Sequence, residues 1–426
     1  SCDDFLKEEP LDMKSSDQFW KTKADAESGV NALYFGGVPY LHNTDVGGGW
    51  TPKATMWGGI VSGLYVDKRK DRTFTTASEG CNFNIESFDD IAMKYWHEFY
   101  KGISRANFVI ANIPTMTGVL DEATINNYVA QGKFFRAYGY FWLGKEFGGV
   151  PYISEPYTST EGMYKERLSA EEVYKKIEAD LLDIVNGDAL PNKTFYENGC
   201  YVTRAMAQTL LAQVYLQWAG APLNGGADYY GKAAQMALKV INDSPHELIH
   251  PNGTTDDLNS AYNVIKTTKE SAEIIYAKEY NYTNYSVGNS YACRSIGTDA
   301  FQWGVFHPGG DVLYNAYLPC DMLLNSYASN DIRGHEKQFF FKQYTDAEGK
   351  TYTLNNAGNW AWFDENALIS GHDGDYNMPV FRFAEVLLIA AEGLARTNHE
   401  DNAVGGAKYY LNQVLDWQMR RLQETI

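Results

Sequence analysis

One short segment of the sequence has the spacing of a zinc site. Residues 246–250 read His-Glu-Leu-Ile-His, which is the H-E-x-x-H pattern of zinc-dependent hydrolases. In such enzymes the two histidines lie one turn apart on a helix and bind the metal, while the glutamate activates the metal-bound water. His246, Glu247 and His250 are therefore candidate residues of a zinc-dependent surface hydrolase.

The neighbours of this segment argue against a helix. Pro245 directly precedes His246, and Pro251 directly follows His250. A residue before proline avoids the helical region, and proline removes a backbone donor from any helix that continues through it. We therefore predict no metal ligands and no catalytic residues, and we keep the zinc-dependent hydrolase as the weaker alternative.

A second set of residues could bind a sugar. The chain has 31 Tyr and 10 Trp, and many of them fall in two long segments rich in Gly, Asn and Thr, residues 36–90 and 281–375. A sugar ring has an apolar face that packs on an aromatic ring, and its hydroxyls pair with amide, carboxylate and guanidinium groups. The chemistry that this set favours is binding without turnover.

Trp303 is the strongest single candidate, because Asp299 and Gln302 flank it and a turn rich in Gly and Pro follows it. The predicted ligand-binding residues are Trp303, Asp299, Gln302, Arg294, Tyr291, Tyr285, Trp50, Asn82, Phe83 and Trp360. The same two segments also hold Trp57, Phe74, Asn84, Tyr282 and Trp362. Aromatic residues inside helical segments are expected in the core instead, among them Trp96, Trp142 and Trp218.

Helices must provide the frame that positions these segments. Apolar residues recur at three- and four-residue spacing over residues 91–113, which Pro114 ends, and over residues 122–147, which a Gly-Gly pair ends. Ser169 and Glu172 form a capping box that opens a helix to about Val185. Four more helices are expected at residues 203–219, 228–242, 379–396 and 406–423.

These helices form pairs with short connections, and alanines such as Ala233, Ala237 and Ala390 allow neighbouring helices to approach closely. The pattern predicts a mostly α fold, a tetratricopeptide-like helix-pair scaffold with long irregular loops and few short strands, for example Glu336–Tyr344. We expect one domain over residues 1–426, with a helical frame at 91–245 and 378–423 and recognition loops at 36–90 and 281–375.

The composition of the chain excludes some classes of binding partner. The formal net charge of -18 repels phosphate backbones, so we expect no nucleic-acid binding. The sequence has no apolar run of about 20 residues, so we expect no membrane-spanning helix. Cys2 follows a small residue and precedes a polar stretch, which predicts lipid attachment at Cys2 and a tether over residues 1–15. The other cysteines have no metal-site or redox spacing, and no cofactor is expected.

The chain is similar to the SusD/RagB family in six segments that occur in the family's order. They are CDDFLKEEP, YWHEFYKGISRANFVIANI, FFRAYGYFWLGKEFGGVPYI, TRAMAQTLLAQVYLQWAG with YYGKAAQMALKVIND, SAEIIYAKEY and MPVFRFAEVLLIAAEGLA. The resemblance covers residues 1 to about 415. The segment after Val414 departs from the family's usual Arg/Glu-rich continuation.

This resemblance implies a non-catalytic lipoprotein on the outer face of the outer membrane. It implies that the protein captures oligosaccharides and delivers them to a SusC-like TonB-dependent transporter. The RagB branch of the family handles peptides, so peptide capture is the alternative function on the same scaffold. The aromatic, amide-rich segments favour a sugar.

Overall fold

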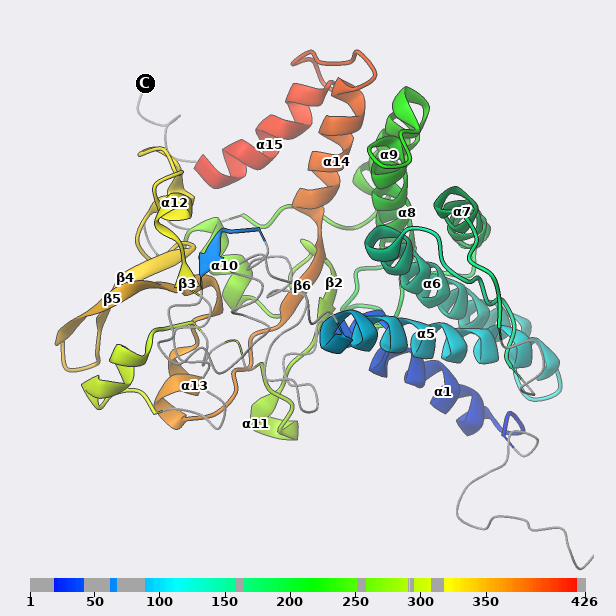
Figure 1. Cartoon of the computed structure of the whole chain (residues 1–426), viewed down its shortest axis with the longest axis horizontal. Coiled ribbons are helices and arrows are strands. Elements are labelled where there is room, and N and C mark those ends of the chain that lie inside the picture. Colours follow the sequence, from blue (N-terminus) through cyan, green and yellow to red (C-terminus); the bar gives the residue numbers. More distant parts are fainter. Residues whose placement is uncertain are drawn as a thin grey trace, which may run out of the picture.

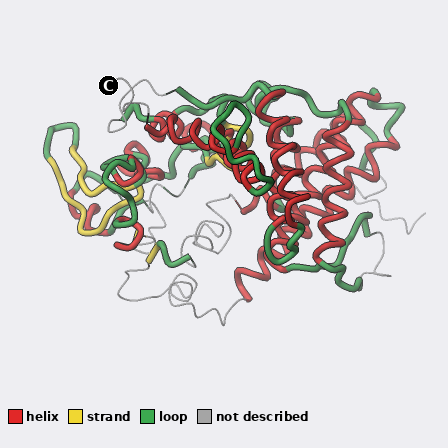
Figure 2. The backbone as a smooth tube through the Cα atoms, turned by 90° about the horizontal axis from the view of Figure 1, so that it is seen from above, coloured by secondary structure: helices red, strands yellow, loops and turns green. Residues whose placement is uncertain are grey.

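The computed structural model describes residues 19–41, 62–66, 89–157, 164–250, 258–289, 291, 295–307 and 318–419. Long helices gather on one side of the molecule, and the strands β4 and β5 with several short helices lie on the other (Figure 1, Figure 2). The predicted fold class, mostly α with helix pairs and few short strands, is confirmed. In the described part of the chain, no helix is both long enough and apolar enough to span a membrane.

The helical frame is a stack in which each long helix packs against the next. The order of contact is α5 on α6, α6 on α7, α7 on α8, α8 on α9, α9 on α14 and α14 on α15. Such stacking in line is how helix-pair repeats bury a continuous core. The helices are α5 (Asp89–Asn112), α6 (Glu122–Phe147), α7 (Ala170–Asn186), α8 (Arg204–Ala219), α9 (Gly226–Asp243), α14 (Phe383–Ala395) and α15 (Ala407–Met419).

The ends of these helices follow the predicted signals. The Ser169 hydroxyl accepts a hydrogen bond from the backbone N–H of Glu172, and the Glu172 carboxylate accepts one from the backbone N–H of Ser169 at 2.9 Å. This capping box opens α7 as predicted. Asp121 caps α6, and α6 ends at Gly148, whose φ of 71° favours glycine.

Small residues set the spacing between α5 and α6. A Cβ atom added to Gly132 would lie 2.9 Å from Ile110 Cγ1, and one added to Gly139 would lie 2.9 Å from Ile103 Cγ1. These distances are shorter than carbon–carbon contacts allow. The two glycines, seven residues apart on one face of α6, therefore let the helices approach more closely than alanine would.

A buried ion pair ties α5, α6 and α7 together. Both Asp180 oxygens accept hydrogen bonds from the Arg136 guanidinium at 2.7 Å, and the same guanidinium donates to Asn107 and to the Ser154 carbonyl, each at 3.1 Å. The paired side chains are only 9% and 11% exposed. Because every partner comes from a different segment, this pair fixes α5, α6 and α7 relative to one another and to the connection that follows α6.

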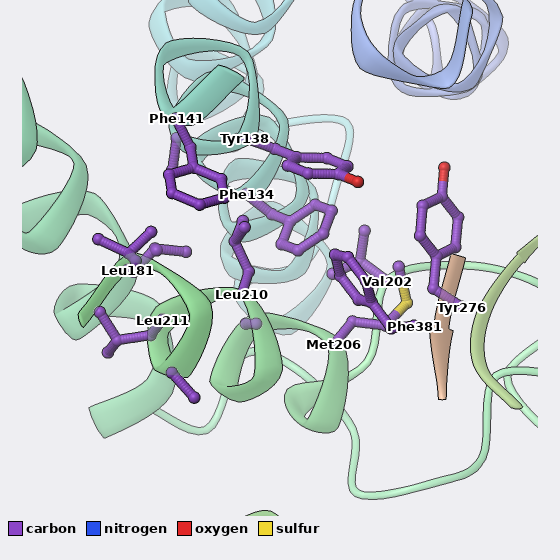
Figure 3. Close-up of a cluster of buried hydrophobic side chains, with 14 of the residues drawn as sticks. Phe134, Tyr138, Phe141, Leu181, Val202, Met206, Leu210, Leu211, Tyr276 and Phe381 are labelled. Carbon is purple, nitrogen blue, oxygen red and sulfur yellow. The ribbon is translucent and has the colours of Figure 1, made fainter. Parts of the chain in front are cut away.

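The prediction of helix from residue 379 was wrong for its first residues. Residues Met378–Arg382 form β6, which pairs antiparallel with β2 (Ile274–Lys278), and α14 begins only at Phe383. Residues 378–382 form a strand instead of a helix because alternate side chains of the strand reach the helical core. The rings of Phe381 and Tyr138 lie 5.5 Å apart, and those of Phe381 and Tyr276 lie 5.6 Å apart. Figure 3 shows both strand residues packed beside Phe134 and Met206.

The second region has its own hydrophobic core. β4 (Phe340–Thr345) and β5 (Thr351–Asn359) form an antiparallel hairpin, and η5 (Thr298–Trp303), η7 (Trp360–Trp362) and α13 (Glu365–Ser370) complete the region. Its buried cluster consists of Ile296, Ala300, Phe306, Phe341, Tyr344, Leu354, Trp360, Phe363 and Leu368. Much of the predicted recognition loop 281–375 is therefore packed structure.

Short elements connect the two regions or extend them. They are α1 (Lys23–Asn31), η2 (Ala32–Phe35), α2 (Val38–Leu41), β1 (Tyr65–Val66), η3 (Ile113–Thr115), α10 (Ala261–Thr267), α11 (Tyr282–Tyr285), β3 (Leu318–Pro319), α12 (Asp321–Leu324) and η6 (Ile332–Gly334). Among them, α11 begins four residues after the end of β2.

Candidate ligand-binding surface

Several predicted contact residues lie outside the described residues. They are Trp50, Asn82, Phe83 and Arg294, together with the further candidates Trp57, Phe74 and Asn84. The predicted lipidation site, Cys2, also lies outside them. The candidate surface is therefore built from the second segment, residues 281–375.

Two predicted contact residues are part of the protein interior. Tyr291 is 1% exposed and stacks on Trp362, with ring centroids 4.9 Å apart. Trp360 is 8% exposed, stacks on Phe363, and donates its indole N–H to Asn263 at 2.6 Å. The prediction that these rings form a sugar platform was wrong, because neighbouring side chains already cover them and satisfy the indole N–H of Trp360.

Trp303 is partly buried at the edge of the second core. Its ring stacks on Tyr352, with centroids 4.8 Å apart and an interplanar angle of 20°. The ammonium of Lys350 lies 4.6 Å from the centroid of the Tyr352 ring. Asp299 accepts a hydrogen bond from the backbone N–H of Asn355 at 2.8 Å, whereas the side chain of Gln302 is exposed. Trp303 is thus held by packing, and Gln302 is the accessible member of the predicted trio.

Among the predicted aromatic residues that the structure describes, Tyr285, at the end of α11, is the most exposed. Its side chain is 75% exposed, although an apolar ring is costly to leave in water. Next to it Thr283, Asn284, Ser286 and Val287 are exposed. We call the surface formed by Tyr282, Thr283, Asn284, Tyr285 and His372 the α11 face.

A carboxylate holds the α11 face in place. Asp375 accepts hydrogen bonds from the backbone N–H groups of Tyr282 and Thr283, and from the Thr283 hydroxyl at 2.6 Å. Partial burial would raise the pKa of Asp375, but these hydrogen bonds outweigh burial and lower the pKa below its usual value. The carboxylate is therefore charged at neutral pH and keeps the turn fixed.

Backbone pairing adds to this rigidity. The backbone N–H groups of Asn289 and Gly374 donate to each other's carbonyl at 2.7 and 2.9 Å, and Asn281 pairs with Val287. Ser286 takes the left-handed conformation, φ 55°, that reverses the chain after α11. A surface that is already ordered loses little conformational entropy when a ligand binds.

The second ring of the face is also oriented. Tyr282 stacks on His372 with centroids 5.0 Å apart and an interplanar angle of 26°, and its hydroxyl lies 3.2 Å from His372 Nδ1. Tyr285, three residues after Tyr282 in the same helical turn, supplies a further exposed ring, and Asn284 supplies an exposed amide. Rings for the apolar face of a sugar and amide or hydroxyl groups for its edge are thus brought together.

His372 and Asp375 were not predicted. They lie in a short segment, residues 371–375, where Gly371 and Gly374 indicate a turn. That signal places the segment at the surface, but it does not reveal that the turn packs against α11, whose residues come about ninety positions earlier. Tyr282 and Tyr285 were found because tyrosines in a polar segment are themselves a signal.

The geometry needed for a zinc hydrolase is absent at residues 246–250. This segment is not helical, and its side chains face different surroundings: His246 is buried, and Glu247 and His250 are exposed. His246 Nδ1 donates to the Ala272 carbonyl at 2.6 Å, and burial lowers the pKa of His246. Within the described ranges, no three His, Cys, Asp or Glu side chains are grouped as a metal site requires.

Comparison with known proteins gives consistent matches along the chain. Residues 62–216 match a family model described as starch-binding associating with outer membrane, and residues 272–416 match the model of the SusD family. A SusD-like protein of Formosa agariphila is 30% identical over 427 residues, covering 95% of this chain and 77% of the relative. A second one is 26% identical over 402 residues, covering 92% and 74%.

Solved structures give the same result for the fold. A SusD superfamily protein from Parabacteroides distasonis superimposes with a TM-score of 0.76 at 23% identity, covering 93% of this chain and 85% of the other. Surface glycan-binding protein A from Bacteroides thetaiotaomicron, solved in complex with laminarihexaose, has a TM-score of 0.68 at 20% identity, covering 93% and 83%.

Proposed function

The chain belongs to the SusD family, and from this premise we propose that it captures oligosaccharides at the cell surface without turning them over. The α11 face is the proposed contact surface. The observation that carries this proposal is the exposure of Tyr285, at 75%, on a turn that Asp375 holds rigid. An exposed ring on an ordered turn can pack against a sugar at little entropic cost.

Two solved relatives support an oligosaccharide as the ligand. One is the Bacteroides thetaiotaomicron protein solved with laminarihexaose, and the other is a chain solved with a xylogluco-oligosaccharide, which superimposes with a TM-score of 0.68. These are two different oligosaccharides, so the relatives support the class of ligand and leave the particular glycan to experiment.

The predicted delivery role also belongs to this proposal. Captured oligosaccharide passes to a SusC-like TonB-dependent transporter, and a lipid on Cys2 tethers the protein to the outer face of the outer membrane. One family model that matches this chain is described as associating with the outer membrane, which supports that location. Delivery requires release, so the shallow α11 face, with few contacts per sugar, suits the role.

Trp303, Asp299 and Gln302 remain in the proposal as a second contact area. Trp303 packs on Tyr352, so its replacement would disturb the second core as well as any ligand contact. Gln302 is the cleaner probe of this area, because its side chain is exposed and its removal leaves the ring stack intact.

The test is a calorimetric binding screen of the full chain against soluble glucans, xyloglucan, host glycans and a peptide pool. We expect saturable binding to one glycan class, weakened at least tenfold by Tyr285→Ala, or about 1.4 kcal/mol. Tyr164→Ala removes a tyrosine outside the α11 face that is even more exposed, at 102%, and this variant should bind as the wild type does. Binding to peptides alone would replace this function with peptide capture, and unchanged binding by Tyr285→Ala would remove the α11 face from it.

A further inference from the structure

A cavity of about 490 Å³ lies within the helical frame, away from the α11 face. Helices α6, α8 and α14 form its walls, with Tyr230 of α9 and two residues of β6 closing it. Figure 3 shows three of its apolar lining residues, Tyr138, Phe141 and Phe381, where they meet the core. The volume is that of a small ligand site.

The cavity contains a carboxylate without a cationic partner. Glu385 on α14 is partly buried. Its side chain accepts a hydrogen bond from the neutral amide of Gln213 at 2.9 Å, and the backbone N–H of Arg382 also stabilises the carboxylate. No ion pair joins Glu385 to any described Lys or Arg side chain. Removing a carboxylate from water is costly unless a positive charge or several donors compensate it.

The burial of Glu385 also changes the pKa of its carboxyl group. Burial raises the pKa of Glu385 to about 7, although Gln213, Arg382 and Lys145 each act to lower it. The positive charges of Arg382 and Lys145 therefore reach the carboxylate but do not neutralise it. A cation placed inside the cavity would do so.

Aromatic and amide groups surround the carboxylate. The indole N–H of Trp142 is inaccessible to solvent and makes no hydrogen bond of standard geometry, although it points toward the Tyr138 hydroxyl. Gln217 adds an amide, and Tyr230 adds a ring. These groups suit a compact ligand that has both hydroxyls and a ring face.

The remaining charges favour a cation over an anion. Glu392 lines the cavity two turns along α14 from Glu385, which makes two carboxylates on the same face. The one lysine of the lining, Lys145, is exposed and lies 4.8 Å over the Trp142 ring. This geometry is that of a cation–π contact, which a ligand cation could also make with the ring.

We propose that this cavity binds a small polyhydroxylated ammonium compound, represented by a free amino sugar, with its ammonium against Glu385. The ring of the sugar packs between the aromatic walls, and Gln213 and Gln217 take its hydroxyls. This site is separate from the α11 face and does not depend on the oligosaccharide proposal.

The experiment compares three probes with the same pyranose ring by calorimetry at pH 7, using the full chain. D-glucosamine carries the ammonium, whereas N-acetyl-D-glucosamine and D-glucose are neutral. We expect D-glucosamine to bind at least tenfold more tightly than either neutral probe. Equal affinity for D-glucosamine and D-glucose, or no binding of D-glucosamine, would overturn the proposal.

Two variants locate the binding. Glu385→Gln keeps the shape and the hydrogen bond to Gln213 but removes the charge, and should abolish the preference for D-glucosamine. Glu155→Gln makes the same charge change at an exposed position and should retain it. If Glu385→Gln binds D-glucosamine as tightly as the wild type does, the site is not this cavity. Tyr285→Ala should leave D-glucosamine binding unchanged, which separates this result from the test of the oligosaccharide function.

Discussion

The helical frame and the second region, around β4 and β5, bury their side chains in different ways. In the frame, alanine, glycine and aliphatic residues recur along regular helices, and aromatic rings fill the spaces between helix pairs. In the second region, five of the nine buried residues are aromatic, and they come from a hairpin, short helices and turns. Large rings let irregular backbone bury enough apolar area, since each ring covers a large surface.

This difference changes how the aromatic content is interpreted. A high count of Tyr and Trp indicates ligand contact only where the rings remain exposed after packing. In the second region Tyr291 and Trp360 are used for packing, and Trp303 partly so. On the α11 face, Tyr285 is not used for packing. A hydrogen-bonded turn holds it in place instead of a core.

The largest effect is expected from breaking the ion pair that ties the frame. Arg136→Ala leaves Asp180 charged and poorly accessible, so the free energy of unfolding should fall by about 3–5 kcal/mol. Lys133→Ala removes a cation from the same pair of helices, where Lys133 contacts the 61% exposed Asp183 at 2.6 Å, and should cost about 1 kcal/mol or less. If urea denaturation showed the same loss of unfolding free energy in both variants, the structural role of the Arg136–Asp180 pair would be contradicted.

A core deletion in the second region should act locally. Phe306 is 1% exposed and lies 4.7 Å from the Tyr344 ring, so Phe306→Ala should cost about 3 kcal/mol. Because the two regions have separate clusters, hydrogen exchange should accelerate in β4 and β5 and remain slow in α6 to α9. Uniform acceleration along the chain would show instead that the two clusters unfold as one unit.

Glu385 should make the frame less stable as the pH rises. Its pKa of about 7 lies above its unfolded value, so between about pH 4.5 and pH 7 the folded chain binds more protons than the unfolded chain. Stability therefore falls with pH in this window. Relative to Glu385→Gln, the wild type should lose about 2 kcal/mol between pH 5 and pH 7.5, measured by denaturant unfolding, and Glu155→Gln should follow the wild type. If the stability of Glu385→Gln changed with pH as that of the wild type does, the raised pKa of Glu385 would be refuted.

In the second region, Lys266 should make the fold more stable as the pH rises, which is the opposite of the effect of Glu385. Lys266 lies 4.4 Å over the Trp360 ring, and burial lowers the pKa of Lys266 to about 7, with Asp364 acting against this shift. Above pH 7 the unfolded chain keeps a proton that the folded chain has released, so stability rises with pH. Between pH 7 and pH 9 the wild type should gain about 1–2 kcal/mol relative to Lys266→Met. Lys165→Met, at an exposed position, should show no such difference.

Much of the frame could be predicted because helices leave local signals. The capping box at Ser169, the stop at Gly148 and the apolar spacing of α5 and α8 each fall within a few residues of the observed ends. The start of α14 was misplaced because residues 378–382 have a partner, β2, about a hundred positions away. Pairing at that distance leaves no local pattern.

The candidate site could be predicted only in part for the same reason. Tyr282 and Tyr285 stand out by residue type, whereas His372 and Asp375 acquire a role only when the turn at residues 371–375 packs on α11. Trp360 was predicted to contact a ligand because it lies in a Gly- and Asn-rich segment. The sequence does not reveal that its indole N–H already pairs with Asn263.

Oligosaccharide binding at the α11 face is tested most directly by hydrogen–deuterium exchange of the full chain, with and without a saturating amount of the tightest-binding glycan. We expect new protection in residues 281–289 and 371–376, and unchanged exchange in α5 to α9. Protection confined to the frame helices, with residues 281–289 unchanged, would contradict the claim that the α11 face carries the oligosaccharide.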